Sequence, residues 1–190
     1  MVDDILKNKA QTVLGLIDGD SLGVTLPHEH LFVDMRCYLI KPTNPRGKEL
    51  SRQKLALENI WYAKYHRFSS EDNLLLNDEA MAIRETMYFK EAGGRTIVDM
   101  TWHNQYENIK GIVNIAKATG LNIIKGTSFY IADSYTPEMN MESRSENDIA
   151  REFIRDVTVG IGNTGVKAGI IGEIGMSWPS KEVEEKVLRA

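Results

Sequence analysis

The sequence contains little cysteine, no excess of basic residues and no long apolar run. Cys37 is the single cysteine among 190 residues, which excludes an internal disulfide and is compatible with a reducing compartment. Lys and Arg number 23 against 27 Asp and Glu, so the net charge of -4 leaves no basic surface typical of nucleic-acid binding. No apolar run approaches the roughly 18 residues of a membrane span, and residues 1–20 lack the pattern of a signal peptide. We therefore expect a globular protein in the cytoplasm, with no nucleic-acid or membrane partner.

Two closely spaced histidines end an apolar run near the N-terminus. His28 and His30 flank Glu29 and follow residues 22–27, LGVTLP, which are predicted to form a strand. Because side chains alternate along a strand, the two imidazoles share one face and Glu29 points to the other. Imidazole is a common ligand of zinc and neighbouring transition metals. The pattern predicts a metal site, and the alternative is one hydrogen-bonded core histidine beside one solvated histidine.

Strand-like and helix-like segments alternate along the rest of the chain. Such alternation is typical of βαβ units and a parallel sheet. The polar residues 18–21 predict a hairpin turn between residues 13–17 and 22–26. Further strands are predicted at residues 95–100, 121–127 and 168–175, and helices at residues 50–67, 74–92, 106–118, 146–159 and 177–190.

Two architectures agree with this alternation, a doubly wound sheet and a (β/α)8 barrel. No GxGxxG motif follows the first strand, which disfavours a dinucleotide-binding fold. Polar residues gather where the predicted strands end, and a barrel keeps its active site at that end. We therefore predict an α/β fold, a (β/α)8 TIM barrel of which about the first four βα units are present. The polar residues concerned are His28, His30, residues 99–103, Tyr130 and Glu173.

Three segments of the chain resemble the phosphotriesterase-related proteins of the amidohydrolase superfamily. Residues 22–30, LGVTLPHEH, are similar to the opening metal motif of that family, and residues 96–99, TIVD, are similar to its second strand. Residues 160–175 resemble its fourth-strand region. The resemblance runs from about residue 12 to the last residue and implies a barrel with two divalent metal ions, with Zn²⁺ as the expected metal. In that family a hydroxide between the two metals attacks an ester.

The resemblance also implies the metal ligands. His28 and His30 match the ligands of the first metal, and Glu173 matches the carboxylate that bridges the two metals. Many members use a carboxylated lysine as the bridge, but its aligned position here is Gly172, so the chain resembles the members that bridge with Glu. Burying an unpaired carboxylate in the otherwise apolar strand around Glu173 would be costly, which also favours a metal partner. If a lysine were the bridge instead, Lys125 and Lys167 would be the candidates.

Further site residues follow from position and resemblance. Tyr130 resembles the pocket tyrosine of the lactone-cleaving members and is the candidate catalytic residue, with loop packing as the alternative. Asp99 is predicted either to orient a metal ligand or to bond a backbone amide. Trp102 and His103 lie in the loop after the second barrel strand and are candidates for lining the substrate pocket.

The resemblance implies a metal-dependent hydrolase that cleaves an ester bond of a small molecule, with a lactone or carboxylic ester favoured over a phosphoester. Such a barrel takes about 250 residues or more. Residues 1–190 are therefore expected to form the N-terminal half of a single barrel domain, inactive alone and lacking the remaining ligands. A homodimer of the full-length protein remains open. The competing interpretation is a complete, non-catalytic protein that binds a metal or a partner.

Overall fold

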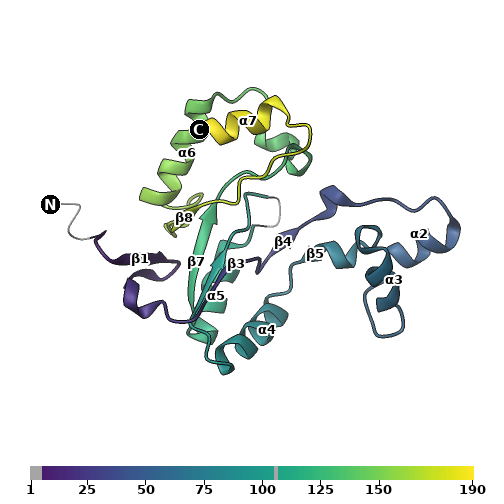
Figure 1. The fold of residues 1–190 in the computed structure, drawn as a ribbon, viewed down its shortest axis with the longest axis horizontal. Coiled ribbons are helices and arrows are strands. Elements are labelled where there is room, and N and C mark those ends of the chain that lie inside the picture. The colour runs from purple at the N-terminus through teal and green to yellow at the C-terminus, as the bar shows by residue number, and fades with distance from the viewer. Residues whose placement is uncertain (1–5, 105–106) are drawn as a thin grey trace.

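The computed structural model describes residues 6–104 and 107–190 (Figure 1). Its central sheet has four parallel strands in the order β3-β6-β7-β8. β3 (Thr25–Glu29) pairs with β6 (Thr96–Asp99), and β6 pairs with β7 (Asn122–Thr127). The two-residue strand β8 (Ile170–Ile171) lies at the far edge. Within the described residues, β3 and β8 each leave one edge of the sheet without a strand partner.

Helices connect the successive strands of this sheet. α4 (Glu79–Glu91) precedes β6, α5 (Ile109–Thr119) joins β6 to β7, and α6 (Glu146–Thr158) lies between β7 and β8. α7 (Glu182–Arg189) follows β8 and packs beside α6 (Figure 1). The strands lie in the sheet in the order in which they occur along the chain, as in a barrel. The predicted fold class, an α/β fold with the first four βα units of a (β/α)8 barrel, is confirmed.

The N-terminal hairpin is formed by earlier residues than predicted. β1 (Lys9–Thr12) pairs antiparallel with β2 (Gly15–Asp18), and the turn is formed by residues 13 and 14. Gly15 follows that turn with a φ of 122°, a conformation that glycine adopts without strain. Residues 19–21 form a short 3-10 helix in place of the expected hairpin turn. The strand that follows, β3, joins the parallel sheet instead of the hairpin.

A long excursion, residues 35–74, separates β3 from α4 and is called the arm. Its two ends are joined by the antiparallel pair β4 (Val33–Asp34) and β5 (Leu75–Leu76). The arm carries α2 (Pro45–Ser51) and α3 (Ile60–Tyr65), which extend away from the sheet in Figure 1.

The prediction of a single helix at residues 50–67 is wrong, because contacts with Asp72 interrupt the helix between α2 and α3. The carboxylate of Asp72 accepts a hydrogen bond from the backbone N–H of Leu55 at 2.9 Å and pairs with the ammonium of Lys54 at 2.7 Å. Both contacts hold residues 54 and 55 in a non-helical path between α2 and α3.

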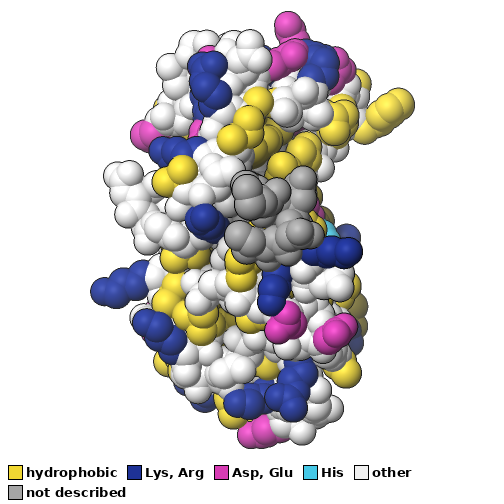
Figure 2. Space-filling model, turned by 90° about the vertical axis from the view of Figure 1, so that its left-hand side faces the viewer, with side chains coloured by type: hydrophobic (Ala, Val, Ile, Leu, Met, Phe, Trp, Pro, Cys, Tyr) yellow, Lys and Arg dark blue, Asp and Glu magenta, His cyan; other side chains and the backbone are white. Residues whose placement is uncertain are grey.

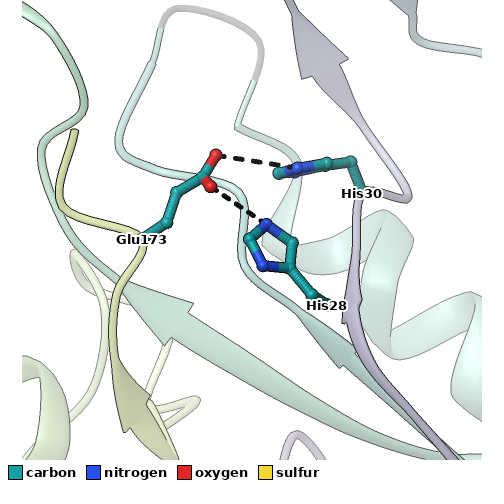
Figure 3. Close-up of side chains that lie close together, drawn as sticks. All are labelled: His28, His30 and Glu173. Carbon is teal, nitrogen blue, oxygen red and sulfur yellow. Dashed lines mark ion pairs between the residues drawn. The ribbon is translucent and has the colours of Figure 1, made fainter. Parts of the chain in front are cut away.

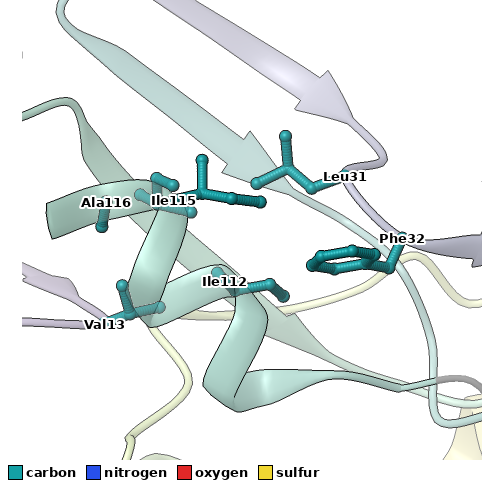
Figure 4. Close-up of a cluster of buried hydrophobic side chains, with 7 residues drawn as sticks. Val13, Leu31, Phe32, Ile112, Ile115 and Ala116 are labelled. Atoms are coloured by element: carbon teal, nitrogen blue, oxygen red, sulfur yellow. The ribbon is translucent and has the colours of Figure 1, made fainter. Parts of the chain in front are cut away.

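Helix α5 supplies the main core. Ile112, Ile115 and Ala116 lie on one side of the helix and pack with Ile123 of β7 and with Phe32 (Figure 4). The helix begins where Asn108 accepts a hydrogen bond from the N–H of Gly111, and it ends at Gly120, which has a φ of 68°. A second core forms between α6 and α7 from Phe129, Met141, Ile149, Phe153, Val183 and Val187.

The surface carries charges of both signs. Figure 2 shows basic and acidic side chains interspersed over one face, with hydrophobic side chains exposed in several places. On the edge strand β8, Ile170 is 40% exposed and Ile171 is 53% exposed. A helix with the length and apolar character needed to cross a membrane does not occur in the described part of the chain.

Candidate metal centre

Strand β3 delivers the two histidines to one place. His28 lies within β3 and His30 lies one residue after its end, next to β6. Their rings are 5.4 Å apart between centroids and meet edge to face. The two side chains are 51% and 26% exposed, so a group bound between them would be reachable from solvent.

Glu173 completes the cluster from the other edge of the sheet, two residues after β8. Its Oε2 lies 2.9 Å from Nε2 of His28, and its Oε1 lies 3.7 Å from Nε2 of His30 (Figure 3). One donor atom from each residue lies within 4.8 Å of the other two. The structure therefore brings together all three residues that the sequence singled out, although β3 and β8 are at opposite edges of the sheet. Two imidazoles and one carboxylate form a donor set that fits a divalent metal such as zinc.

The surroundings of His30 favour the form that can bind a metal. Burial lowers the pKa of His30 below its ordinary value, and the nearby Glu173 opposes this shift only in part. Nδ1 of His30 lies 3.0 Å from Oγ1 of Thr101, which is one of the polar residues 99–103 but had no individual role predicted from the sequence. Asp99 accepts a hydrogen bond from the backbone N–H of Leu31 at 2.8 Å. Of the two roles predicted for Asp99, the structure places it on a backbone amide.

Aromatic rings border the three residues. Trp102 is 1% exposed and meets His30 edge to face, with ring centroids 5.8 Å apart. Tyr130, which follows β7, stacks on Trp102 at 4.3 Å. The hydroxyl of Tyr38, which comes from the arm, donates a hydrogen bond to the hydroxyl of Tyr130 at 3.3 Å. Gly175 lies so close to the Tyr130 ring that a Cβ there would come within 2.4 Å of it, so the segment carrying Glu173 passes directly over the ring.

His103 lies in a different environment from the one expected. Its Nε2 is 3.0 Å from Oδ2 of Asp156, and its Nδ1 is 3.0 Å from Oε2 of Glu107. Burial alone would lower the pKa of His103, but its hydrogen bonds to the carboxylates of Asp156 and Glu107 raise the pKa to about 9. The imidazole is therefore an imidazolium held between two carboxylates. The prediction that His103 lines the substrate pocket is therefore wrong. Trp102, in contrast, does lie against His30, one of the candidate metal ligands.

The same histidine belongs to a second group that could in principle hold a metal, formed with Glu152 and Asp156. Glu152 is already paired with the guanidinium of Arg144, and Asp156 is paired with the charged His103. These pairs balance the charges without a metal. The group is best described as an ion-pair network between α6 and the loop after β6.

The fourth histidine, His66, ends α3 on the arm and packs against the ring of Tyr62, with centroids 5.0 Å apart. His28 and His30 are thus the two histidines that meet Glu173. The second metal implied by the resemblance would need ligands other than these.

Comparisons with known proteins show which family the chain resembles. The profile of the Phosphotriesterase family matches residues 8–190. An N-acetyltaurine hydrolase of Xenopus tropicalis is 40% identical and a phosphotriesterase-related protein of Nematostella vectensis is 35% identical, over 97% and 95% of this chain. The chain spans about half the length of these relatives, 52% in both cases.

Solved structures give the same result. A resiniferatoxin-binding protein from Rhodobacter sphaeroides is 32% identical and superposes with a TM-score of 0.90, over 95% of this chain and 50% of that one. A phosphotriesterase homology protein from Escherichia coli, with phosphate in its active site, is 25% identical with a TM-score of 0.65, over 88% of this chain and 47% of that one.

Proposed function

Because this chain belongs to the phosphotriesterase family, we propose that it contributes the first half of the active site of a metal-dependent hydrolase. The observation that carries the proposal is the convergence of His28, His30 and Glu173 from opposite edges of one sheet, with donor atoms within 4.8 Å of one another. The three residues come from the two edges of one parallel sheet, which distinguishes this site from a cluster of neighbouring surface residues. The N-terminal half of one barrel domain remains our interpretation of residues 1–190.

His28 and His30 would hold one divalent metal ion through Nε2, and Glu173 would bridge it to a second ion. Glu173 suits that role because a carboxylate offers two oxygens and a negative charge. Divalent metals bound here would lower the pKa of water and polarise the oxygen of a scissile bond. We propose Zn²⁺, because imidazole and carboxylate are common zinc ligands.

Lys125 is a poor candidate for a carboxylated bridge. Its side chain is 1% exposed and donates to the backbone carbonyls of Gly126 and Thr101. An ammonium engaged in this way cannot become a carbamate without losing those hydrogen bonds.

The substrate class that we favour is a small carboxylic ester or lactone. The hydroxyl of Tyr38 donates a hydrogen bond to the oxygen of Tyr130, and a phenol that accepts one hydrogen bond still has its own proton to donate. A donor fixed by stacking on Trp102 can stabilise the negative charge that develops on a carbonyl oxygen during attack. Tyr130 is therefore proposed as the catalytic donor.

A second candidate substrate class is an N-acyl amide, because the relative from Xenopus tropicalis is named as an N-acetyltaurine hydrolase. Amides and esters both pass through attack on a carbonyl carbon, so the same donor would serve either class. The residues that distinguish the two would have to recognise the leaving group.

The test is a comparison of kcat/KM for lactones, carboxylic esters, N-acyl amides and phosphotriesters on the zinc-loaded full-length protein. We expect the best substrate to be a carbonyl compound, with a lactone or ester first. A phosphotriester that is hydrolysed faster than every carbonyl substrate would contradict this assignment. A protein that binds zinc and hydrolyses none of the four classes would favour the non-catalytic interpretation. The cytoplasmic location and a homodimer stay predictions from the sequence.

A further inference from the structure

The side of β7 that faces the helices carries a lysine where a core residue is expected. Lys125 lies two residues after Ile123, so both side chains are on the face of β7 that packs on α5. The ammonium donates to the carbonyl of Gly126 at 2.8 Å and to the carbonyl of Thr101. Removing an ammonium from water is costly unless its donors are satisfied. The position of Lys125 therefore suggests a role other than packing.

Carboxylates complete the environment of this lysine. Oδ1 of Asp99 lies 3.7 Å from its Nζ, and Oε1 of Glu107 lies 3.6 Å away. Asp99 is fully buried and also accepts hydrogen bonds from the N–H of Thr101 at 3.1 Å and the N–H of Leu31 at 2.8 Å. The backbone of Thr101 is thus held at both polar groups, its N–H by Asp99 and its carbonyl by Lys125.

Thr101 in turn reaches the metal centre. Its Oγ1 lies 3.0 Å from Nδ1 of His30, while Nε2 of the same ring faces Glu173. A neutral imidazole binds a metal through the nitrogen that carries no proton, and the bond made by the other nitrogen decides which one that is. If Nδ1 donates its proton to Thr101, Nε2 is free for the metal.

We propose that Thr101 is a positioning residue that holds His30 as the Nδ1–H tautomer with Nε2 directed at the metal, and that the buried Lys125 and Asp99 hold Thr101 in place. The proposal deepens the metal centre of the proposed function and rests on it. The contacts of His30 and Lys125 with Thr101 join β3 and β7 to the loop after β6, and Asp99 holds Thr101 within that loop.

The tautomer is tested without any metal. ¹⁵N NMR of the histidine rings in the metal-free full-length protein should show a proton on Nδ1 of His30 in the wild type and in Thr101→Ser, which keeps the hydroxyl. In Thr101→Val, which keeps the shape but loses the acceptor, that preference should be lost. The same Nδ1–H tautomer in all three proteins would overturn the proposal.

Zinc affinity, measured by competition with a chelator, tests the consequence. Thr101→Val should weaken Zn²⁺ binding about 10- to 100-fold, and Thr101→Ser should restore most of it. Lys125→Met should weaken binding in the same direction. The matched control is Lys90→Met, because Lys90 also donates to a backbone carbonyl, that of Thr119, but near the start of β7. Its zinc affinity should not change.

The outcomes separate the two proposals. Unchanged zinc affinity in a folded Thr101→Val variant would overturn the positioning role. If circular dichroism shows that Lys125→Met is unfolded, the comparison of Thr101→Val with Thr101→Ser still tests the positioning role. If the wild type binds no Zn²⁺, the metal centre itself is wrong, and the tautomer comparison still tests Thr101 independently.

Discussion

Glu184 on α7 connects the two loops that border the candidate metal centre, and its neutralisation should loosen them. The carboxylate is fully buried. It accepts hydrogen bonds from the N–H of Ala132 at 2.9 Å, the N–H of Ser177 at 2.9 Å, the hydroxyl of Ser177 at 2.6 Å and the N–H of Lys181 at 3.0 Å. Ala132 belongs to the loop that carries Tyr130, and Ser177 to the loop that carries Glu173. Glu184→Gln removes the charge and turns one acceptor into a donor that faces other donors.

The size of the effect follows from the pKa of the carboxyl. Burial alone would raise the pKa of Glu184, but the hydrogen bonds from Ser177, Ala132 and Lys181 lower it from 4.5 to about 2. That difference corresponds to roughly 3 kcal/mol of stability at neutral pH. Because the folded-state pKa is the lower one, this contribution is complete above pH 4.5 and is lost as the pH falls towards 2.

Urea unfolding of the full-length protein at several pH values measures this contribution. Wild type should lose stability between pH 4.5 and 2 more steeply than Glu184→Gln, and the variant should be roughly 3 kcal/mol less stable at pH 7. Other carboxylates titrate equally in both proteins, so the difference isolates Glu184. Glu182→Gln, an exposed residue of the same helix, is the control and should behave as wild type. Equal stability of wild type and Glu184→Gln at pH 7 would refute the reasoning.

Three further predictions concern the donor, the core and the sheet edges. Tyr130→Phe should lower kcat on a lactone or ester roughly 10²- to 10³-fold, whereas Tyr88→Phe on exposed α4 should not; equal rates would exclude Tyr130 as the donor. Ile115→Ala in the α5 core should cost about 2–5 kcal/mol in urea unfolding, and a loss below 1 kcal/mol would mean that the core is not close-packed there. Residues 1–190 expressed alone should aggregate, because the open edges of β3 and β8 expose backbone groups and the side chains of Ile170 and Ile171; a sharp, cooperative melt of a monomer would contradict this.

Elements with strong local signals could be predicted from the sequence. α6 begins where Ser145 caps it, at the residue where the helical pattern starts, and α5 ends at Gly120 as expected from a glycine stop. β6 and β7 are short and β-branched, and they lie within the predicted ranges. Each of these signals is contained in a few adjacent residues.

Elements that depend on distant contacts could not be predicted in the same way. The polar residues 18–21 have the composition of a hairpin turn, but the chain makes its hairpin at residues 13 and 14. The helix expected at residues 50–67 is interrupted by Asp72, which bonds the backbone of Leu55 from 17 residues away. Nothing in the local pattern at residue 55 indicates that contact.

The site also contains residues that local sequence spacing identifies and residues that only distant contacts reveal. The spacing of His28 and His30 identifies them at once, because two residues on a strand share a face. Thr101 reaches His30 across 71 residues, and Tyr38 reaches Tyr130 across 92. Neither Thr101 nor Tyr38 forms a motif with its neighbours, so the structure was needed to find them.

The metal content of the purified protein tests the central claim most directly. Elemental analysis should find a divalent metal in the wild type and in His66→Ala, the control on the arm, and little in His28→Ala or His30→Ala. Glu173→Gln should also lower the metal content, and reconstitution of the metal-free wild type should need no bicarbonate. Unchanged metal content in both His28→Ala and His30→Ala would contradict the account.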